Sequence, residues 1–98
     1  MNLHVSFHES AETELNEAAE YYESQVKGLG NAFLNDVQAT IGFIQANPES
    51  SPRIFKVVRN YLLRRFPYSI LYSNKENVIN ILAIAHQKRR PYYWRVRE

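Results

Sequence analysis

The chain of 98 residues contains no cysteine, so disulfide bonds and thiolate chemistry are excluded. It also has no apolar run close to the roughly 20 residues that a membrane-spanning helix requires. Its first residues carry neither the basic stretch nor the apolar stretch of a secretion signal. We therefore expect a small cytoplasmic protein that does not associate with a membrane.

Several sequence motifs of common enzymes are missing as well. The chain has no glycine-rich phosphate-binding loop and no nucleophile-elbow motif. His4 and His8 are four residues apart, but on a strand-like segment they would not converge on one metal ion as they would on a helix. His86 has no second histidine and no carboxylate beside it. We therefore expect no metal ion and no cofactor.

Basic residues are nearly absent from the first half of the chain. Residues 1–50 contain eight acidic residues and one cation, a net charge of −7. Residues 51–98 contain eleven cations and two acidic residues, a net charge of +9. This asymmetry predicts an acidic face and a basic face, and hence an acidic partner. The alternative is that two solvated faces differ in sign without any functional consequence.

The first half of the chain predicts a strand followed by two helices. Apolar and polar residues alternate over residues 3–7, which predicts a short strand, and Ser10 is then the expected N-cap of a helix. Gly28 and Gly30 are expected to end this helix, and Asn31 to cap a second one. Because the connection is short, the two helices should form an antiparallel hairpin.

The second half changes to four strand-like runs. They cover Ile54–Arg59, Tyr61–Phe66, Tyr68–Ser73 and Val78–Ala85. Asn60 is expected to form a tight turn between the first two runs, and residues 74–77 a hairpin loop. The last run is almost continuously apolar, which places it inside the sheet. The expected fold is a single α+β domain of residues 1–98, ordered β-α-α-β-β-β-β, with the helical hairpin packed on a mostly antiparallel sheet.

Cations and aromatic rings are concentrated just after the last predicted strand. His86 and Gln87 are followed by three basic residues, a proline and three rings: Lys88, Arg89, Arg90, Pro91, Tyr92, Tyr93 and Trp94. Such a cluster suits an anionic or nucleic-acid-related partner. Two structural alternatives stay open. His86 could fix the strand end through a backbone hydrogen bond, and Trp94 could form a lid over the end of the sheet.

Three segments of this half resemble the ParE/RelE superfamily of bacterial toxins, on its ParE-like side. They are FPYSILY at 66–72, ILAIAH at 81–86 and RPYYW at 90–94. Residues 5–25 and 30–54 resemble the superfamily too, so the resemblance covers nearly the whole chain. Its members are toxins of type II toxin–antitoxin modules, also known as plasmid stabilisation proteins. The resemblance implies a helical hairpin on an antiparallel sheet, in agreement with the order of elements predicted above.

The resemblance implies two rival activities. ParE-like members inhibit DNA gyrase by binding it and need no active site of their own. RelE-like members cut messenger RNA in the ribosomal A site with basic residues and a tyrosine. RelE itself carries an arginine directly after the tyrosine that corresponds to Tyr68, and another just after the last strand. Here Ser69 and Gln87 occupy those positions, and one lost donor typically lowers the rate about 10²–10³-fold.

We therefore expect a toxin that inhibits DNA gyrase and forms a heteromeric complex with a cognate, ParD-like antitoxin. The basic half predicts that the antitoxin contributes an acidic, amphipathic segment that folds on the toxin. The expected target-facing residues are Arg64, Arg89, Arg90, Tyr93 and Trp94. One alternative is a ribosome-dependent nuclease that acts on messenger RNA with His86, Arg89 and Tyr93. The other is a non-toxic binding module derived from such a toxin.

Overall fold

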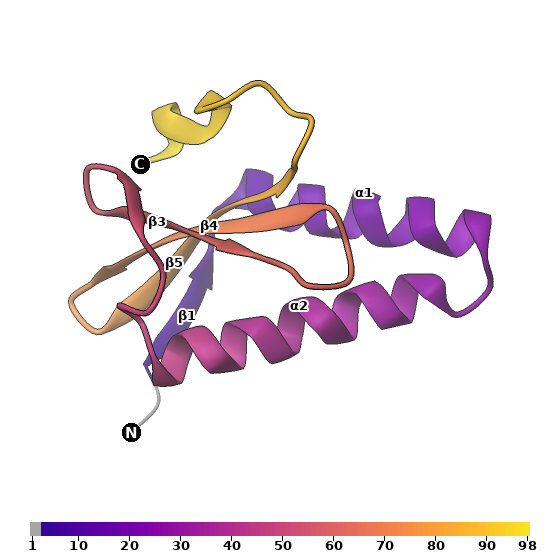
Figure 1. Ribbon diagram of the computed structural model, residues 1–98, viewed down its shortest axis with the longest axis horizontal. Helices are drawn as coiled ribbons and strands as arrows, with labels where there is room; N and C mark the ends of the chain where they lie inside the picture. The colour runs from indigo at the N-terminus through magenta and orange to yellow at the C-terminus, as the bar shows by residue number, and fades with distance from the viewer. Residues whose placement is uncertain (1–2) are drawn as a thin grey trace.

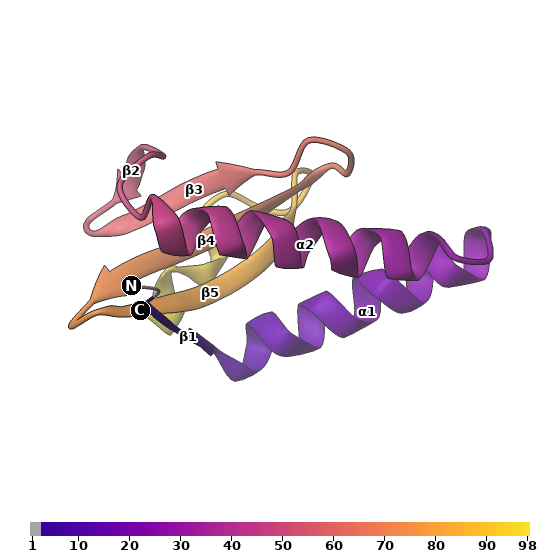
Figure 2. The ribbon, with the colours of Figure 1, turned by 90° about the horizontal axis from the view of Figure 1, so that it is seen from below.

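The computed structural model describes residues 3–98, and it has three layers. Two helices cover one face of a five-stranded sheet, and a C-terminal segment lies across the other face (Figure 1). Figure 2 shows the helices in front of the sheet and the C-terminal segment behind it. The elements are β1 (His4–Phe7), α1 (Glu9–Gln25), α2 (Leu29–Ala46), β2 (Arg53–Phe55), β3 (Val58–Leu62), β4 (Tyr68–Lys75), β5 (Val78–His86) and the 3-10 helix η1 (Tyr93–Arg97). The predicted fold class and order of elements are confirmed.

The strands lie in the order β1-β5-β4-β3-β2. Only β1 and β5 are parallel, and the other neighbours are antiparallel. The almost continuously apolar run thus forms β5, which has a neighbour on each side, as predicted. The pairing of β1 ends where Phe7 meets Ile81, whereas β5 continues to His86. The last part of β5 therefore has a strand on one side only.

The N-terminus of α1 is capped by His8, so the prediction of Ser10 as N-cap is wrong. His8 follows β1 in an extended conformation, and its Nδ1 accepts a hydrogen bond of 3.1 Å from the backbone N–H of Ser10. The backbone N–H of His8 donates to Ile81 O at 2.8 Å, which continues the pairing of β1. The pairing with β5 keeps the chain extended up to His8, so α1 begins at the next residue and Ser10 lies within its first turn.

The second helix begins after Gly28, so the prediction of Asn31 as its cap is also wrong. Gly28 has a φ of 88°, a conformation that favours glycine, and α2 starts at the next residue. The carboxylate of Glu23 accepts hydrogen bonds of 2.9 to 3.1 Å from the N–H groups of Gly28 and Gly30. An acid at the end of α1 therefore caps α2, because a negative charge is favoured at a helix N-terminus.

Gly30 and Gly42 provide a matched test of how closely the two helices pack. A Cβ atom at Gly30 would lie 2.6 Å from Ala19 O on α1, whereas one at Gly42 would meet open space. We expect Gly30→Ala to lower the free energy of unfolding by about 1–3 kcal/mol, because the helices must move apart. Gly42→Ala should raise it by about 0.5–1 kcal/mol. Urea denaturation measures both, and equal effects would contradict the close approach at Gly30.

The turn between the first two predicted strands was misplaced. The chain reverses at Lys56, which has a φ of 52°, and Asn60 lies within β3 opposite Leu71. The sequence favoured Asn60 because asparagine readily adopts the positive φ of a tight turn, whereas a residue such as Lys56 seldom does. The predicted hairpin loop at residues 74–77 is confirmed and is narrower: Glu76 and Asn77 form the turn, both with positive φ.

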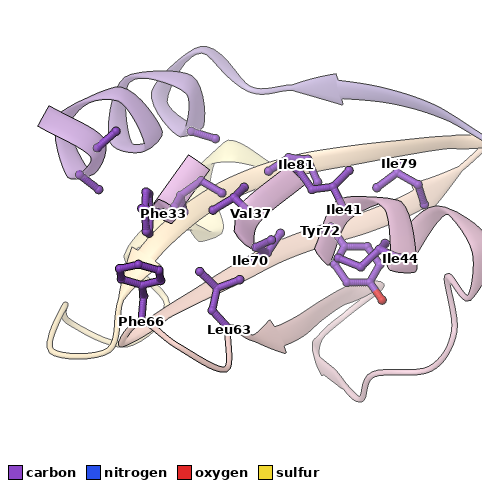
Figure 3. Close-up of a cluster of buried hydrophobic side chains, with 14 residues drawn as sticks. Phe33, Val37, Ile41, Ile44, Leu63, Phe66, Ile70, Tyr72, Ile79 and Ile81 are labelled. Carbon is purple, nitrogen blue, oxygen red and sulfur yellow. The ribbon is translucent and has the colours of Figure 1, made fainter. Parts of the chain in front are cut away.

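The sheet buries apolar side chains on both faces. The core on the helix side contains Phe33, Val37, Ile41 and Ile44 from α2, and Phe66, Ile70, Tyr72, Ile79 and Ile81 from the sheet side (Figure 3). The core on the opposite side, here called the tail core, consists of Val58, Leu71, Leu82, Ala83, Ala85 and Trp94. Leu82 is an extra residue in β5, because Leu71 pairs with Ala83 and Tyr72 with Ile81. This bulge places both Leu82 and Ala83 in the tail core.

Candidate functional site

The C-terminal segment and the end of the sheet enclose an open hollow of about 330 Å³. Sheet residues such as Asn60 and Ser69 line one side of it, and residues 89–94 line the other. We call three of the exposed side chains that border the hollow the tail rim: Arg89, Arg90 and Tyr92. The cations and rings that the sequence singled out are thus brought together at one edge of the molecule. Among the described residues, Asn60 Oδ1 is one of the buried polar atoms that have no hydrogen-bond partner.

Trp94, one of the expected target-facing residues, has a buried side chain. Its side chain is 3% exposed and packs in the tail core, and its ring lies 5.9 Å from that of Phe55. Ala83 and Ala85 of β5 provide a flat apolar surface that a large indole ring can cover. The alternative interpretation of Trp94 as a lid over the end of the sheet is the one that the structure shows. Tyr92, 43% exposed, presents its ring instead.

Arg64 is not part of the tail rim. It follows β3 and lines a different hollow, together with Tyr61, Leu62 and the α2 residues Asp36 and Phe43. The predicted target-facing set is therefore divided. Arg89, Arg90 and Tyr93 lie together around the C-terminal segment, whereas Arg64 lies on the side of the molecule that α2 covers.

The structure adds one residue that the sequence prediction missed, Glu14 of α1. Its carboxylate accepts a hydrogen bond of 2.7 Å from the hydroxyl of Tyr93. The guanidinium of Arg97 donates two further bonds, of 2.9 and 3.0 Å, one to each oxygen. Arg89 Nη1 lies 3.8 Å from Oε2. We call Glu14, Arg89, Tyr93 and Arg97 the C-terminal clasp.

The clasp fixes the protonation state of Tyr93. Burial, the hydrogen bond to Glu14 and the charge of Glu14 raise the pKa of Tyr93 well above that of a free tyrosine, although Arg89 and Arg97 act in the opposite direction. The guanidinium of Arg89 lies 3.8 Å from the centre of the Tyr93 ring, and that of Arg97 lies 5.1 Å from it. The phenol is therefore held neutral as a hydrogen-bond donor, between two cations that contact its ring.

His86 has a structural set of contacts. Its Nδ1 accepts a hydrogen bond of 3.0 Å from the backbone N–H of Lys88, and its ring lies edge-on to that of Tyr68 at 5.0 Å. The adjacent N–H of Gln87 donates to Pro67 O at 2.9 Å. These bonds fix the chain as it leaves β5, as the structural alternative for His86 proposed. Within residues 3–98, no group of histidine, aspartate and glutamate side chains is arranged to hold a metal ion, and no helix is long and apolar enough to cross a bilayer.

A helical hairpin on this sheet, followed by a basic and aromatic C-terminal segment, is the architecture of a bacterial toxin of the ParE/RelE type. The family model of the ParE toxin of the type II toxin–antitoxin system parDE matches residues 5–91, and the chain belongs to that family. It is 32% identical over 95 residues to Toxin ParE2 from two strains of Mycobacterium tuberculosis, covering 93% of this chain and 88% of theirs. It also resembles a solved chain described as "Chromosomal ParDE TA system from P. aeruginosa". That similarity has a TM-score of 0.76 at 19% identity, and it covers 86% of this chain and 95% of the other.

Proposed function

We propose that this toxin acts by binding DNA gyrase through the tail rim and that it does not cleave RNA. The observation that carries this proposal is the engagement of Tyr93 and Arg89 by Glu14. Tyr93, which best fits a nuclease role, already donates its proton to Glu14 within the protein itself, while Arg89 stays half exposed at 3.8 Å from the same carboxylate. The tail rim keeps Arg90 and Tyr92 exposed, and arginine and tyrosine are among the residues that contribute most to protein–protein affinity.

The electrostatics of the clasp argue against cleavage. Cutting RNA at a ribose hydroxyl requires a group that takes the proton and cations that stabilise the charged phosphate. Tyr93 is poorly suited to take a proton at neutral pH, because its raised pKa keeps the phenol protonated and its proton is directed to a carboxylate. Arg89 contacts the Tyr93 ring. By the resemblance described above, Ser69 and Gln87 stand where RelE itself carries arginine.

We propose further that a cognate antitoxin of the ParD type neutralises this toxin. The second half of the chain has a net charge of +9, which favours an acidic antitoxin segment. Such a segment would be disordered when free and would fold on the toxin surface. A salt titration tests this part of the proposal: affinity for the antitoxin should fall steeply as ionic strength rises, because exposed charge pairs are screened.

The test of the function uses purified toxin in two assays. In the first, gyrase supercoils relaxed plasmid in the presence of increasing toxin, and we expect inhibition at micromolar toxin that the antitoxin reverses. In the second, ribosomes stalled on a defined messenger RNA are mixed with the same toxin, and we expect the message to remain intact. Cleavage of the message without inhibition of supercoiling would establish the nuclease alternative. If the toxin neither inhibited supercoiling nor cleaved the message, the result would favour a binding module without toxicity.

A further inference from the structure

On the edge of β5 that faces β1, the last residues of β5 have no strand neighbour, because β1 is shorter. Pairing with β1 ends at Ile81, and β5 runs on to His86. Two backbone groups on this open edge are bound by side chains instead. The N–H of Ile84 donates to Glu14 Oε1 at 3.1 Å, and Arg97 Nη1 donates to Leu82 O at 3.0 Å. An open strand edge normally leaves such groups to water or to another chain.

The pair formed by Glu14 and Arg97 has the hydrogen-bonding chemistry of a residue in a neighbouring strand. A residue of a parallel strand offers one C=O to the edge and one N–H. Here the carboxylate provides the acceptor and the guanidinium provides the donor, and two hydrogen bonds hold them together. Both side chains are mostly buried, with exposed fractions of 12% for Glu14 and 14% for Arg97. The two residues are 83 positions apart, so this edge is completed only when the C-terminal segment is in place.

The same carboxylate also determines where the tail rim lies. The carboxylate binds the hydroxyl of Tyr93, which is the neighbour of Tyr92 in the chain. The Tyr93 ring in turn contacts the guanidinium of Arg89. Trp94 anchors the segment on the sheet at a second point. Two anchors fix both the position and the rotation of the segment, whereas the indole alone would leave the rim free to turn.

We propose that Glu14 is a positioning residue for target binding, which it supports by completing the edge of β5 and by holding the tail rim in place. The part of this inference that concerns the target rests on the function proposed above. Glu14 itself contacts no target. It acts through Tyr93, Arg89 and Arg97, and it reduces the ordering that the rim would otherwise undergo on binding.

The test compares Glu14→Gln with Glu20→Gln. The first substitution keeps an oxygen for Ile84 N–H but removes the charge that holds Arg97. The second removes an exposed charge that has no hydrogen-bond or ion-pair partner within residues 3–98. In Glu14→Gln we expect tryptic cleavage after Arg89 and Arg95 to be about tenfold faster, because the clasp opens locally. We expect a similar rise in the toxin concentration for half-inhibition of gyrase. Glu20→Gln should match the wild type in both.

Titration of Tyr93 is a readout that a loss of stability alone would not change. The groups that face its hydroxyl are Glu14, Arg89 and Arg97. With Glu14 neutral, the pKa of Tyr93 should fall toward that of a free tyrosine, as measured by NMR on tyrosine-labelled toxin. Tyr93→Phe removes only the hydroxyl, and it should speed cleavage of the tail while leaving exchange of the Ile84 amide with solvent unchanged. It also serves as the test variant if Glu14→Gln does not fold.

The inference is overturned if Glu14→Gln behaves like Glu20→Gln in proteolysis and leaves the pKa of Tyr93 unchanged. A toxin that never inhibits gyrase, but whose tail is loosened by Glu14→Gln, would refute the proposed target and support the clasp. A loosened tail with undiminished inhibition would show that gyrase does not require an ordered rim, and it would overturn the positioning role.

Discussion

Phe33→Ala should lower the free energy of unfolding by about 3–5 kcal/mol, a large part of the roughly 5–15 kcal/mol that stabilises a domain of this size. Phe33 is fully buried on α2, beside Phe66 in the core (Figure 3). Its ring lies 5.1 Å from the rings of both Phe66 and Tyr68. Tyr22 of α1 completes this group at 5.3 Å. Removing the ring leaves a cavity where α1, α2 and the start of β4 meet, and rigid secondary structure can close such a cavity only in part.

The control is Phe43→Ala, on the same helix. Phe43 is 45% exposed and contacts Tyr61 at the surface, so its loss should cost well under half as much. Urea denaturation of both variants gives the comparison, with the slope of the transition expected to stay constant. Similar losses at the two positions would show that the aromatic group around Phe33 is not a major source of stability.

Arg90→Glu should raise the toxin concentration needed for half-inhibition of gyrase by about 10²-fold, the effect of a central arginine at a protein interface. Arg90 belongs to the tail rim, and within residues 3–98 its side chain has no hydrogen-bond or ion-pair partner. The fold should be unaffected because the side chain is exposed. Of the two rim arginines, Arg90 is the better choice, since Arg89 also supports the ring of Tyr93.

The control is Lys75→Glu, which makes the same change of charge at the last residue of β4. The tail rim lies near the other end of that strand. Supercoiling assays on both variants separate a local contact from an effect of net charge. We expect Lys75→Glu to change inhibition less than threefold, as is typical of an exposed charge outside an interface. If the two variants weakened inhibition equally, long-range attraction rather than the tail rim would govern binding.

The order and type of the elements could be predicted because they depend on local patterns. Alternation over residues 3–7, helical spacing over the next forty residues and the continuous apolar run of β5 each follow from the period of one element. The cap of α1 could not be predicted in this way. His8 becomes the N-cap because β5 holds the chain at Ile81, a contact between segments far apart in the sequence.

The candidate site could be predicted only in part. The cations and rings after β5 are adjacent in the sequence, so their concentration was visible. Whether a ring faces solvent depends on what lies beneath it, and Trp94 is buried because Ala83 and Ala85 leave space for an indole ring. Glu14 could not be singled out by its residue type, because α1 carries several other glutamates that are exposed. Its helical spacing from Ala11 and Ala18, both buried, was the one signal that it faces the sheet.

Hydrogen–deuterium exchange on the toxin, free and bound to gyrase, tests the central claim most directly. The account predicts slower exchange on binding in residues 87–93, which carry the tail rim, and no change around the hollow that Arg64 and Phe43 line. Protection confined to that second hollow, or no protection anywhere on the toxin, would contradict it.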